Sequence, residues 1–258
     1  MYRRWLAGVA AVLLLAAGSA PWSAGQDRGE GALDVIRKGI KAEGGQKVLE
    51  SLKAAQSKSK GTIHYPAPIG DVAFVAEEFL QLPDKMRSNV RADPNGQNYK
   101  VIVVFDGKTG WVQEKGETKE LDAKGLDEMK ATVYASRVGG LVELLKGKEF
   151  QLSALPEAKV AGKPAVGVLV KHAGQRDIGL YFDKANGLLV KTETRAFDPL
   201  SKKEVSQEKL FAGYKAVQGR QVPHKVTVNQ DGKLFMEVEV TEVRIVDRID
   251  PGMFAKPQ

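Results

Sequence analysis

Apolar residues recur at every second position over long stretches of this chain, and no other feature constrains its fold as strongly. In the run at 99–105, Tyr99, Val101, Val103 and Phe105 share one parity, with Lys100, Ile102 and Val104 between them, and the run ends at the Asp-Gly segment 106–110, after which another run holds Trp111. Asn-Gly and Asp-Gly turns also separate alternating runs at 183–187 and 229–232. A turn of this kind between two alternating runs is a strong signal of a β-hairpin. The sequence therefore predicts several successive antiparallel hairpins.

Two stretches depart from this period and are expected to be helical. Their apolar residues fall at three- and four-residue spacing, from 32 to 52 and again from 125 to 147. Glycine pairs at 44–45 and 139–140 interrupt them, so each predicts two short helices or one broken helix. We expect the basic run 53–60 to lie at a helix end and to form a solvated face, with weak attraction to an anionic membrane surface as the alternative.

The order of these elements indicates the fold class. Helices come first, then strands, then helices, then further strands, which is typical of an α+β fold and not of alternating parallel units. We therefore expect one long antiparallel sheet. No internal segment rich in proline, serine or glycine divides the chain, so residues 26–258 are expected to form a single domain.

The first 25 residues have the three parts of a secretory signal peptide. A basic head with Arg3 and Arg4 precedes an uncharged apolar run at 5–18, and small residues follow. This run is shorter than the roughly 20 residues that a membrane-spanning helix needs. We expect cleavage after Gly25, a mature chain that begins at Gln26, and export to the periplasm. An uncleaved N-terminal anchor is the alternative.

Composition excludes several classes of site. The chain has no cysteine, which excludes disulfides, thiolate metal sites, a cysteine nucleophile and a lipid-modified cysteine. Its formal charge is +7, and the basic residues are mixed with Asp and Glu throughout. A nucleic-acid surface needs a basic stripe interleaved with aromatic residues, and the densest basic run contains no aromatic residue. We therefore expect no nucleic-acid partner.

Residues suited to catalysis are few. His64, His172 and His224 lie far apart and lack metal-ligand spacing, and we expect His224 at the surface or on an edge strand. The sequence contains no nucleophile elbow, phosphate-binding glycine loop or metalloprotease pair. The pair Glu77-Glu78 lies in an alternating run that turns only one of the two carboxyl groups inward. The sequence thus predicts no enzyme, no metal site and no cofactor.

Five segments are informative through their order along the chain. They are Glu43 to Lys47, Leu82 to Lys85, Phe105 to Trp111, Leu180 to Val190, and Tyr214 to Val226. Each alone is a common turn or hairpin pattern. In this order they resemble the outer-membrane lipoprotein-sorting proteins, the LolA-like and LolB-like carriers, in their broader uncharacterised branch.

The resemblance implies a strongly curved antiparallel half-barrel, with helices that close an apolar hollow, and a carrier of lipid or acyl chains. Such a hollow suits alkyl chains because apolar burial is non-directional and contributes about 0.8 kcal/mol per methylene. Alternation offers candidates for its wall, although the same pattern fits an ordinary core packed against helices. The candidates are Phe74, Leu80, Val101, Val103, Phe105, Leu180, Phe182, Val190, Val226, Met236 and Val238.

Two functions stay open at this point. The first is a periplasmic carrier or chaperone for a lipid or for the acyl chains of a lipoprotein, with transient contacts to a membrane surface or an envelope protein. The second is a non-transport binding or sensor module of the envelope that kept the fold and filled the cavity. Fold alone does not choose between them. An apolar pocket open to solvent favours the carrier, and a tightly packed sheet–helix interface favours the module.

Overall fold

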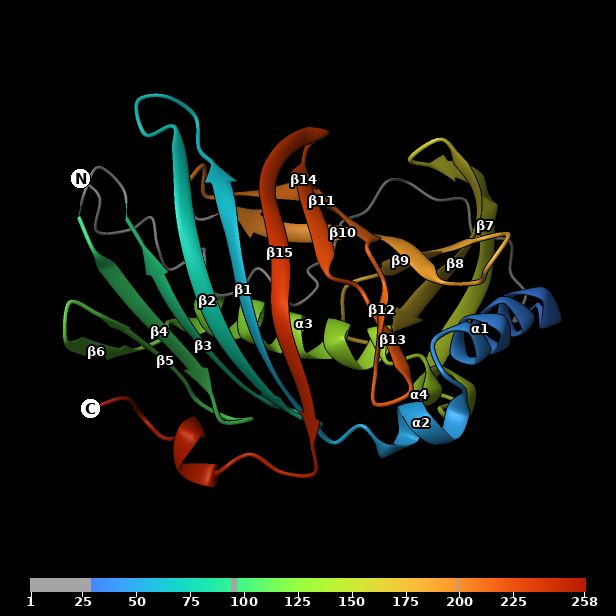
Figure 1. Cartoon of the computed structure of the whole chain (residues 1–258), viewed down its shortest axis with the longest axis horizontal. Helices are drawn as coiled ribbons and strands as arrows, with labels where there is room; N and C mark the ends of the chain where they lie inside the picture. Colours follow the sequence, from blue (N-terminus) through green and yellow to red (C-terminus); the bar gives the residue numbers. More distant parts are fainter. Residues whose placement is uncertain (1–28, 94–96, 199) are drawn as a thin grey trace.

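A long antiparallel sheet dominates the computed structural model, which describes residues 29–93, 97–198 and 200–258. Its thirteen strands follow the order β6-β5-β4-β3-β2-β1-β15-β14-β11-β10-β9-β8-β7 and curve without closing (Figure 1). This confirms the α+β class and the half-barrel. The predicted signal segment, 1–25, lies outside the described residues. The strands are β1 (Ala54–His64), β2 (Asp71–Gln81), β3 (Lys85–Ala92), β4 (Tyr99–Phe105), β5 (Gly110–Glu114), β6 (Glu117–Glu120), β7 (Phe150–Val160), β8 (Lys163–His172), β9 (Ile178–Asp183), β10 (Leu189–Asp198), β11 (Lys203–Ala212), β12 (Lys215–Val217), β13 (Arg220–Val222), β14 (Lys225–Gln230) and β15 (Lys233–Val246).

The helices begin and end close to the predicted positions. Gly44 and Gly45 separate the first two, and both adopt positive φ angles that glycine tolerates best. Gly44 also lies so close to the β12–β13 turn that a β-carbon there would stand 2.3 Å from the carbonyl oxygen of Gly219. The helices are α1 (Glu30–Ala42), α2 (Gln46–Ser51), α3 (Ala123–Gly139), α4 (Val142–Lys146) and the short 3-10 helix η4 (Pro251–Phe254).

The three predicted hairpin turns are confirmed. They join β4 to β5, β9 to β10 and β14 to β15. In the first, a carboxylate oxygen of Asp106 accepts hydrogen bonds from the backbone N–H groups of Lys108 and Thr109 at 2.8 and 2.7 Å. Asp183 accepts one from Ala185 at 2.8 Å in the second. These local bonds explain why short aspartate-containing segments predicted the turns so well.

The basic run 53–60 was predicted wrongly as a helix end. Most of it belongs to β1, which pairs with β2 on one side and β15 on the other. Lys58 and Lys60 point to solvent and form ion pairs of 3.1 Å with Glu242 and Glu239 across the β1–β15 seam. The solvated face is therefore a feature of a strand, and its lysines are matched by carboxylates of the neighbouring strand.

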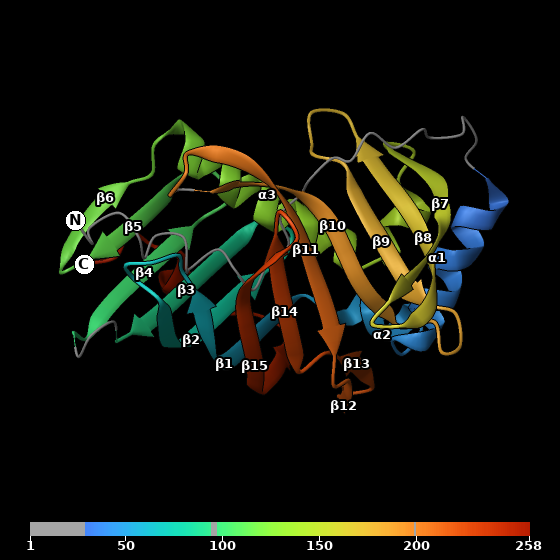
Figure 2. The ribbon, with the colours of Figure 1, turned by 90° about the horizontal axis from the view of Figure 1, so that it is seen from above.

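One helix crosses the hollow of the sheet. Figure 1 and Figure 2 both show α3 running between the half made by β1 to β5 and the half made by β7 to β9. Helices α1, α2 and α4 gather on the β7–β9 side. On the convex side, Ile249 and Phe254 of the η4 segment pack against Phe79, Ile102 and Val104. Within the described ranges, no helix is long and apolar enough to span a membrane.

Candidate functional site

The β1–β5 side of the concave face carries an apolar group that we call the strand cluster. It comes almost entirely from β1 to β4, β14 and β15, and α3 adds only two of its buried side chains. Most of its members therefore reach the hollow from the sheet itself. The buried members are Ile63, Tyr65, Val72, Phe74, Ala76, Met86, Val90, Ala92, Val101, Val103, Phe105, Met129, Val133, Val226, Val228, Met236 and Val238.

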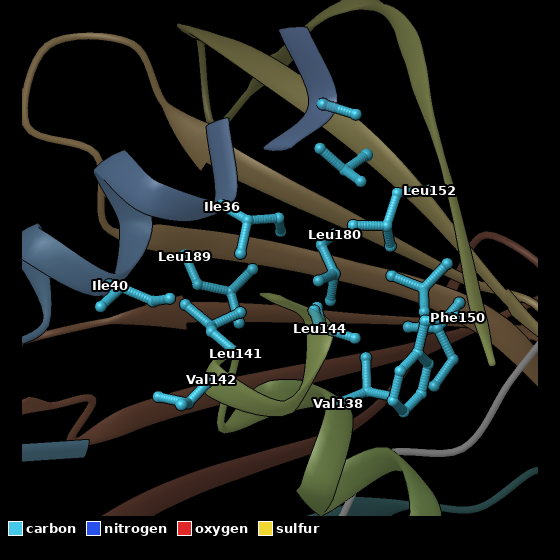
Figure 3. Close-up of a cluster of buried hydrophobic side chains, with 14 of the residues drawn as sticks. Ile36, Ile40, Val138, Leu141, Val142, Leu144, Phe150, Leu152, Leu180 and Leu189 are labelled. Atoms are coloured by element: carbon cyan, nitrogen blue, oxygen red, sulfur yellow. The ribbon is translucent and has the colours of Figure 1, made fainter. Parts of the chain in front are cut away.

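The β7–β10 side carries a second group, the helix cluster, of different construction. Here helical side chains and strand side chains contribute in similar measure, and Figure 3 shows Ile36 of α1, Leu141 of the α3–α4 link and Leu180 of β9 converging. Such mutual burial is typical of a folded core. The buried members are Ala32, Ile36, Ile40, Leu49, Tyr134, Ala135, Val138, Leu141, Val142, Leu144, Phe150, Leu152, Val168, Val170, Ile178, Leu180, Phe182 and Leu189.

The predicted wall residues divide between these groups. Seven are buried in the strand cluster, and Leu80 packs against it while partly exposed. Leu180 and Phe182 belong to the helix cluster instead, where helices cover them. That the strand-cluster residues line a hollow that admits a ligand stays a prediction. The seven are Phe74, Val101, Val103, Phe105, Val226, Met236 and Val238.

Val190 lies apart from the other candidates. It packs with Tyr181 and its neighbours on the convex face, whereas Leu189 occupies the concave face. A bulge between Leu189 and Lys191 shifts the register of β10 against β9. Because side chains alternate along a strand, one extra residue reverses which of them faces inward. Simple alternation therefore selected the wrong residue of this strand.

Polar side chains occupy the concave face together with the apolar clusters. We call Ser59, Glu78, Ser88, Thr192 and Lys209 the polar centre; all five are buried. Glu78 and Ser88 are cross-strand partners, and the serine hydroxyl donates a hydrogen bond of 3.4 Å to the carboxylate. Thr192 and Lys209 are likewise cross-strand partners, on β10 and β11. The polar centre thus draws on both sides of the hollow.

Glu78 and Lys209 act on each other electrostatically across the hollow. Burial raises the pKa of Glu78 to about 8, against the opposing influence of Lys209 and Ser88. Burial also lowers the pKa of Lys209 to about 7, and the attraction of Glu78 opposes this shift. Both shifts favour the neutral forms, as expected for charges removed from water. Near neutral pH the two groups together hold about one proton and carry no net charge.

Two hydroxyls of the polar centre are unusual. The Oγ of Ser59 and the Oγ1 of Thr192 are buried and have no hydrogen-bond partner among the described residues. Ser59 is 4% exposed and Thr192 is fully buried. A buried polar group without a partner costs about 1–3 kcal/mol, so such groups are rare in folded proteins. They provide unused hydrogen-bonding capacity inside an otherwise apolar surface.

Polar contacts hold α3 in place over the hollow. Asp122 caps its first turn by accepting a backbone N–H bond of 2.8 Å. Arg176 forms a two-pronged ion pair with Glu128 of the helix, and one of its two contacts measures 2.9 Å. The Lys124 ammonium lies 3.4 Å from the centre of the Phe197 ring. These contacts lie near the amino-terminal half of α3, beside the strand cluster.

The histidines form no metal centre. His64 is hydrogen-bonded to Asp71 at 2.8 Å, which raises its pKa, and His172 lies elsewhere, at the end of β8. His224, expected at the surface, is buried because backbone bonds to β11 and β15 hold it in the sheet. Its Nδ1 lies 3.0 Å from the carbonyl oxygen of Val222. Among the described residues, no three His, Asp or Glu side chains gather as metal ligands would.

A polar cleft of about 300 Å³ lies at the ends of β4 and β5, away from the polar centre. Amide, lysine and backbone groups line most of it, and the Lys115 ammonium sits 5.2 Å from the Tyr99 ring. Such a lining does not suit an alkyl chain, which gains from apolar contact. The cleft is lined by Gln97, Asn98, Tyr99, Lys100, Gln113, Lys115 and Gly116.

Sequence reasoning identified one carboxyl of the polar centre in general terms and missed its basic partner. The pair Glu77-Glu78 was predicted to turn one group inward, and the structure buries Glu78. Lys209 was not singled out. A signal existed, since Lys209 alternates with Gln207 and Phe211 on the side of β11 that faces the hollow. A lysine at an inward position of an alternating strand is a rare event.

Comparison with known proteins gives a likeness of structure. No family model and no curated protein matches the chain. A LolA superfamily protein from Nitrosomonas europaea superposes with a TM-score of 0.56 at 8% identity, over 87% of this chain and 97% of that one. A DUF1329 family protein from Desulfovibrio piger gives 0.55 at 11% identity, over 87% and 97%.

A third solved structure points to the same family of folds. It is a domain assigned to the outer membrane lipoprotein-sorting proteins, from Vibrio parahaemolyticus, with a TM-score of 0.54 and 11% identity. The alignment covers 87% of this chain and 96% of that domain. Identities this low establish the fold and leave the ligand open. The chain thus has the LolA-like fold that its ordered segments predicted.

Proposed function

We propose that this protein is a periplasmic carrier or chaperone that binds a lipid, or the acyl chains of a lipoprotein, against the strand cluster. The observation that carries the proposal is the unequal cover of the concave face. Helices α1, α3 and α4 close the helix cluster, whereas α3 alone supplies helical side chains to the strand cluster, chiefly Met129 and Val133. Displacement of one helix would therefore present a continuous wall of apolar strands.

The contacts that attach α3 to the sheet support its replacement by a ligand on the strand cluster. Lys124 is exposed, so its contact with Phe197 contributes little, and the two-pronged Arg176–Glu128 pair, with side chains 27% and 18% exposed, is the main polar attachment of the helix. The apolar contacts of Met129 and Val133 can be replaced by an alkyl chain at comparable gain, since apolar burial is non-directional. Tyr134, Ala135 and Val138 keep the second half of α3 in the helix cluster, so only its first half would leave the strand cluster.

The proposal includes export and a binding role without catalysis. Residues 26–258 would act as one carrier domain after cleavage, in keeping with a single continuous sheet. The periplasmic location rests on the signal-like segment of the sequence. N-terminal sequencing of the protein from its native cells should find Gln26 or a close neighbour first. Intact Met1 on a membrane-bound protein would contradict cleavage.

The second candidate is the non-transport envelope module with a filled cavity. One observation favours it: Val228 and Met236 are fully buried, so the strand cluster is tightly packed in this form. The two candidates differ in whether apolar ligands enter. A carrier has a second form with α3 displaced, and the module does not.

Mass spectrometry of organic extracts is the direct test. Protein purified from its native envelope should yield a lipid or fatty acyl species in near-stoichiometric amount, absent from a control protein of similar charge. A fluorescent apolar probe should then bind the delipidated protein with saturation and be displaced by the extracted species. An empty extract combined with no probe binding would rule out the carrier and leave the module.

A further inference from the structure

The polar centre suggests what kind of head group the ligand carries. Lys209 projects from β11 into the hollow and is 2% exposed. Its cross-strand neighbour is Thr192, and Glu78 approaches from β2 on the other side of the hollow. An amine at this buried position can take up a proton when an anion lies beside it, since the paired charges cost less to bury than either charge alone.

Two buried hydroxyls of the polar centre are independent evidence for an anion site. Ser59 Oγ and Thr192 Oγ1 are buried on the concave face and lack hydrogen-bond partners among the described residues. Ser59 is two residues along β1 from the cross-strand partner of Glu78, so both face the same way. Thr192 lies beside Lys209 and Ser59 lies beside Glu78, and Glu78 is close enough to Lys209 to act on it electrostatically. Hydroxyl donors together with an ammonium match the two oxygens of a carboxylate.

From this arrangement we infer that the polar centre binds the carboxylate of a free fatty acid, with the alkyl chain lying along the strand cluster. This rests on the proposed carrier function and names its ligand class. The ligand carboxylate pairs with the Lys209 ammonium and accepts bonds from Thr192 and Ser59. Lys209 takes up a proton as the ligand anion enters and Glu78 stays protonated, so the buried site gains no net charge.

The burial of these groups also sets a limit on the head group. Ser59, Thr192 and Lys209 are each less than 5% exposed, so little space surrounds them. A carboxylate is compact and planar, whereas a phosphodiester carries further substituents that would have to be buried too. The site therefore selects for a single-chain acid over a phospholipid.

Competition between an acid and its ester tests the inference. The delipidated full chain is loaded with an uncharged fluorescent apolar probe, which is displaced by palmitate or by methyl palmitate. Palmitate should bind at least about tenfold more tightly than the ester, the value of one charge-assisted hydrogen bond. Lys209→Met should remove this preference and leave the affinity for the ester unchanged.

A matched lysine provides the control. Lys191 is also largely buried, but it lies on the convex face over the Tyr181 ring and beside Glu193. Lys191→Met should therefore change neither affinity. Thr192→Val is a second, isosteric test and should weaken palmitate alone. If Lys209→Met does not fold, Thr192→Val still tests the carboxylate site.

The outcomes distinguish a failure of the carboxylate site from a failure of the proposed carrier function. Equal displacement by acid and ester in the parent protein would overturn the carboxylate site and leave the carrier intact. An equal loss of both ligands in Lys209→Met would also overturn it, since the lysine would then act through the fold. Displacement by neither compound would sink the proposed carrier function itself. A preference for palmitate that Lys209→Met and Thr192→Val both reduce is the expected result.

Discussion

The helix cluster and the strand cluster lie on one face of the same sheet and bury similar side chains, yet they are built differently. The helix cluster includes buried side chains from each of α1 to α4, whereas α3 alone supplies buried helical side chains to the strand cluster. The polar centre instead reaches the hollow from β1 to β3, β10 and β11, and includes a buried glutamate and lysine. Dense packing in the helix cluster stabilises the fold. The buried polar groups of the polar centre cost stability, which is typical of a binding site. The difference suggests that one half supports the fold and the other exchanges its contents.

The largest difference should appear when the same side chain is removed from each half. Phe182 and Phe105 are 1% and 2% exposed, one in each cluster. Phe182→Ala should lower the free energy of unfolding by about 3–5 kcal/mol, because the interlocked helices cannot collapse into the space. Phe105→Ala should cost clearly less, because α3 can settle into it. Urea unfolding measures both, and equal losses would show that the two clusters are the same kind of core.

Removal of the buried pair should raise stability. Glu78 and Lys209 are buried ionisable groups, and replacing such groups by apolar residues of similar volume often stabilises a protein by about 1–4 kcal/mol. Glu78→Leu combined with Lys209→Met should therefore unfold at higher urea concentration than the parent. A less stable double variant would mean that the pair holds the fold together.

The pKa shifts of Glu78 and Lys209 predict how the stability gain of the double variant depends on pH. The pKa of Glu78 rises from 4.5 to about 8 on folding, so the folded protein binds more protons and stability falls as pH rises through that range. The pKa of Lys209 falls from 10.5 to about 7, so stability rises with pH from 7 to 10.5. The gain of the double variant should therefore be greatest between about pH 7 and 8. A gain that does not vary with pH would show that neither group titrates in the folded state.

Adding bulk should distinguish the halves in the opposite sense. Val168 and Val103 are 0% and 3% exposed, in the helix and strand clusters respectively. Val168→Trp should overpack its surroundings and cost about 1–3 kcal/mol. Val103→Trp should leave the melting temperature nearly unchanged and weaken binding of an apolar probe. A melting temperature lowered as far by Val103→Trp, with no probe binding even in the parent, would contradict the hollow.

The smallest effect is expected at the attachment of α3. Arg176→Met removes the two-pronged ion pair with Glu128, whose side chains are 27% and 18% exposed. Probe association and release, measured by stopped flow, should both become faster because α3 leaves more readily. Arg37→Met, which breaks the exposed pair with Asp34 on α1, is the matched control and should leave both rates unchanged. Unchanged rates in both variants would place the entrance elsewhere.

Local chemistry explains which parts of the fold could be predicted. The turn at 106–110 was predicted because Asp106 bonds to the backbone that follows it. Strand β1 was missed for an equally local reason. Its inward positions carry Ala55, Ser57, Ser59 and Gly61, so the apolar signal of period two is absent although the geometry is present.

The site depends on contacts that no local pattern contains. Glu78 and Lys209 act on each other electrostatically although their strands are far apart in the sequence. The curvature of the whole sheet brings the two groups within range of each other. Val190 was misplaced because a bulge is a property of two paired strands, not of one. The path of α3 over the hollow is likewise a tertiary feature. Alternation thus selected seven of the buried strand-cluster side chains and, of the polar centre, only one carboxyl of the pair Glu77-Glu78.

The seam between β1 and β15 has a consequence for the order of folding. Most strands of the sheet pair with a neighbour in sequence, but Ala54 pairs with Val246 and Ile63 with Met236. Pairing over such separations is slow, because the chain loses entropy before it gains the contacts. During synthesis β15 emerges after every other strand, so the two meanders on either side of the seam exist before anything joins them. In the export that we propose, a chain that joins its two meanders so late would cross the membrane before the full sheet forms.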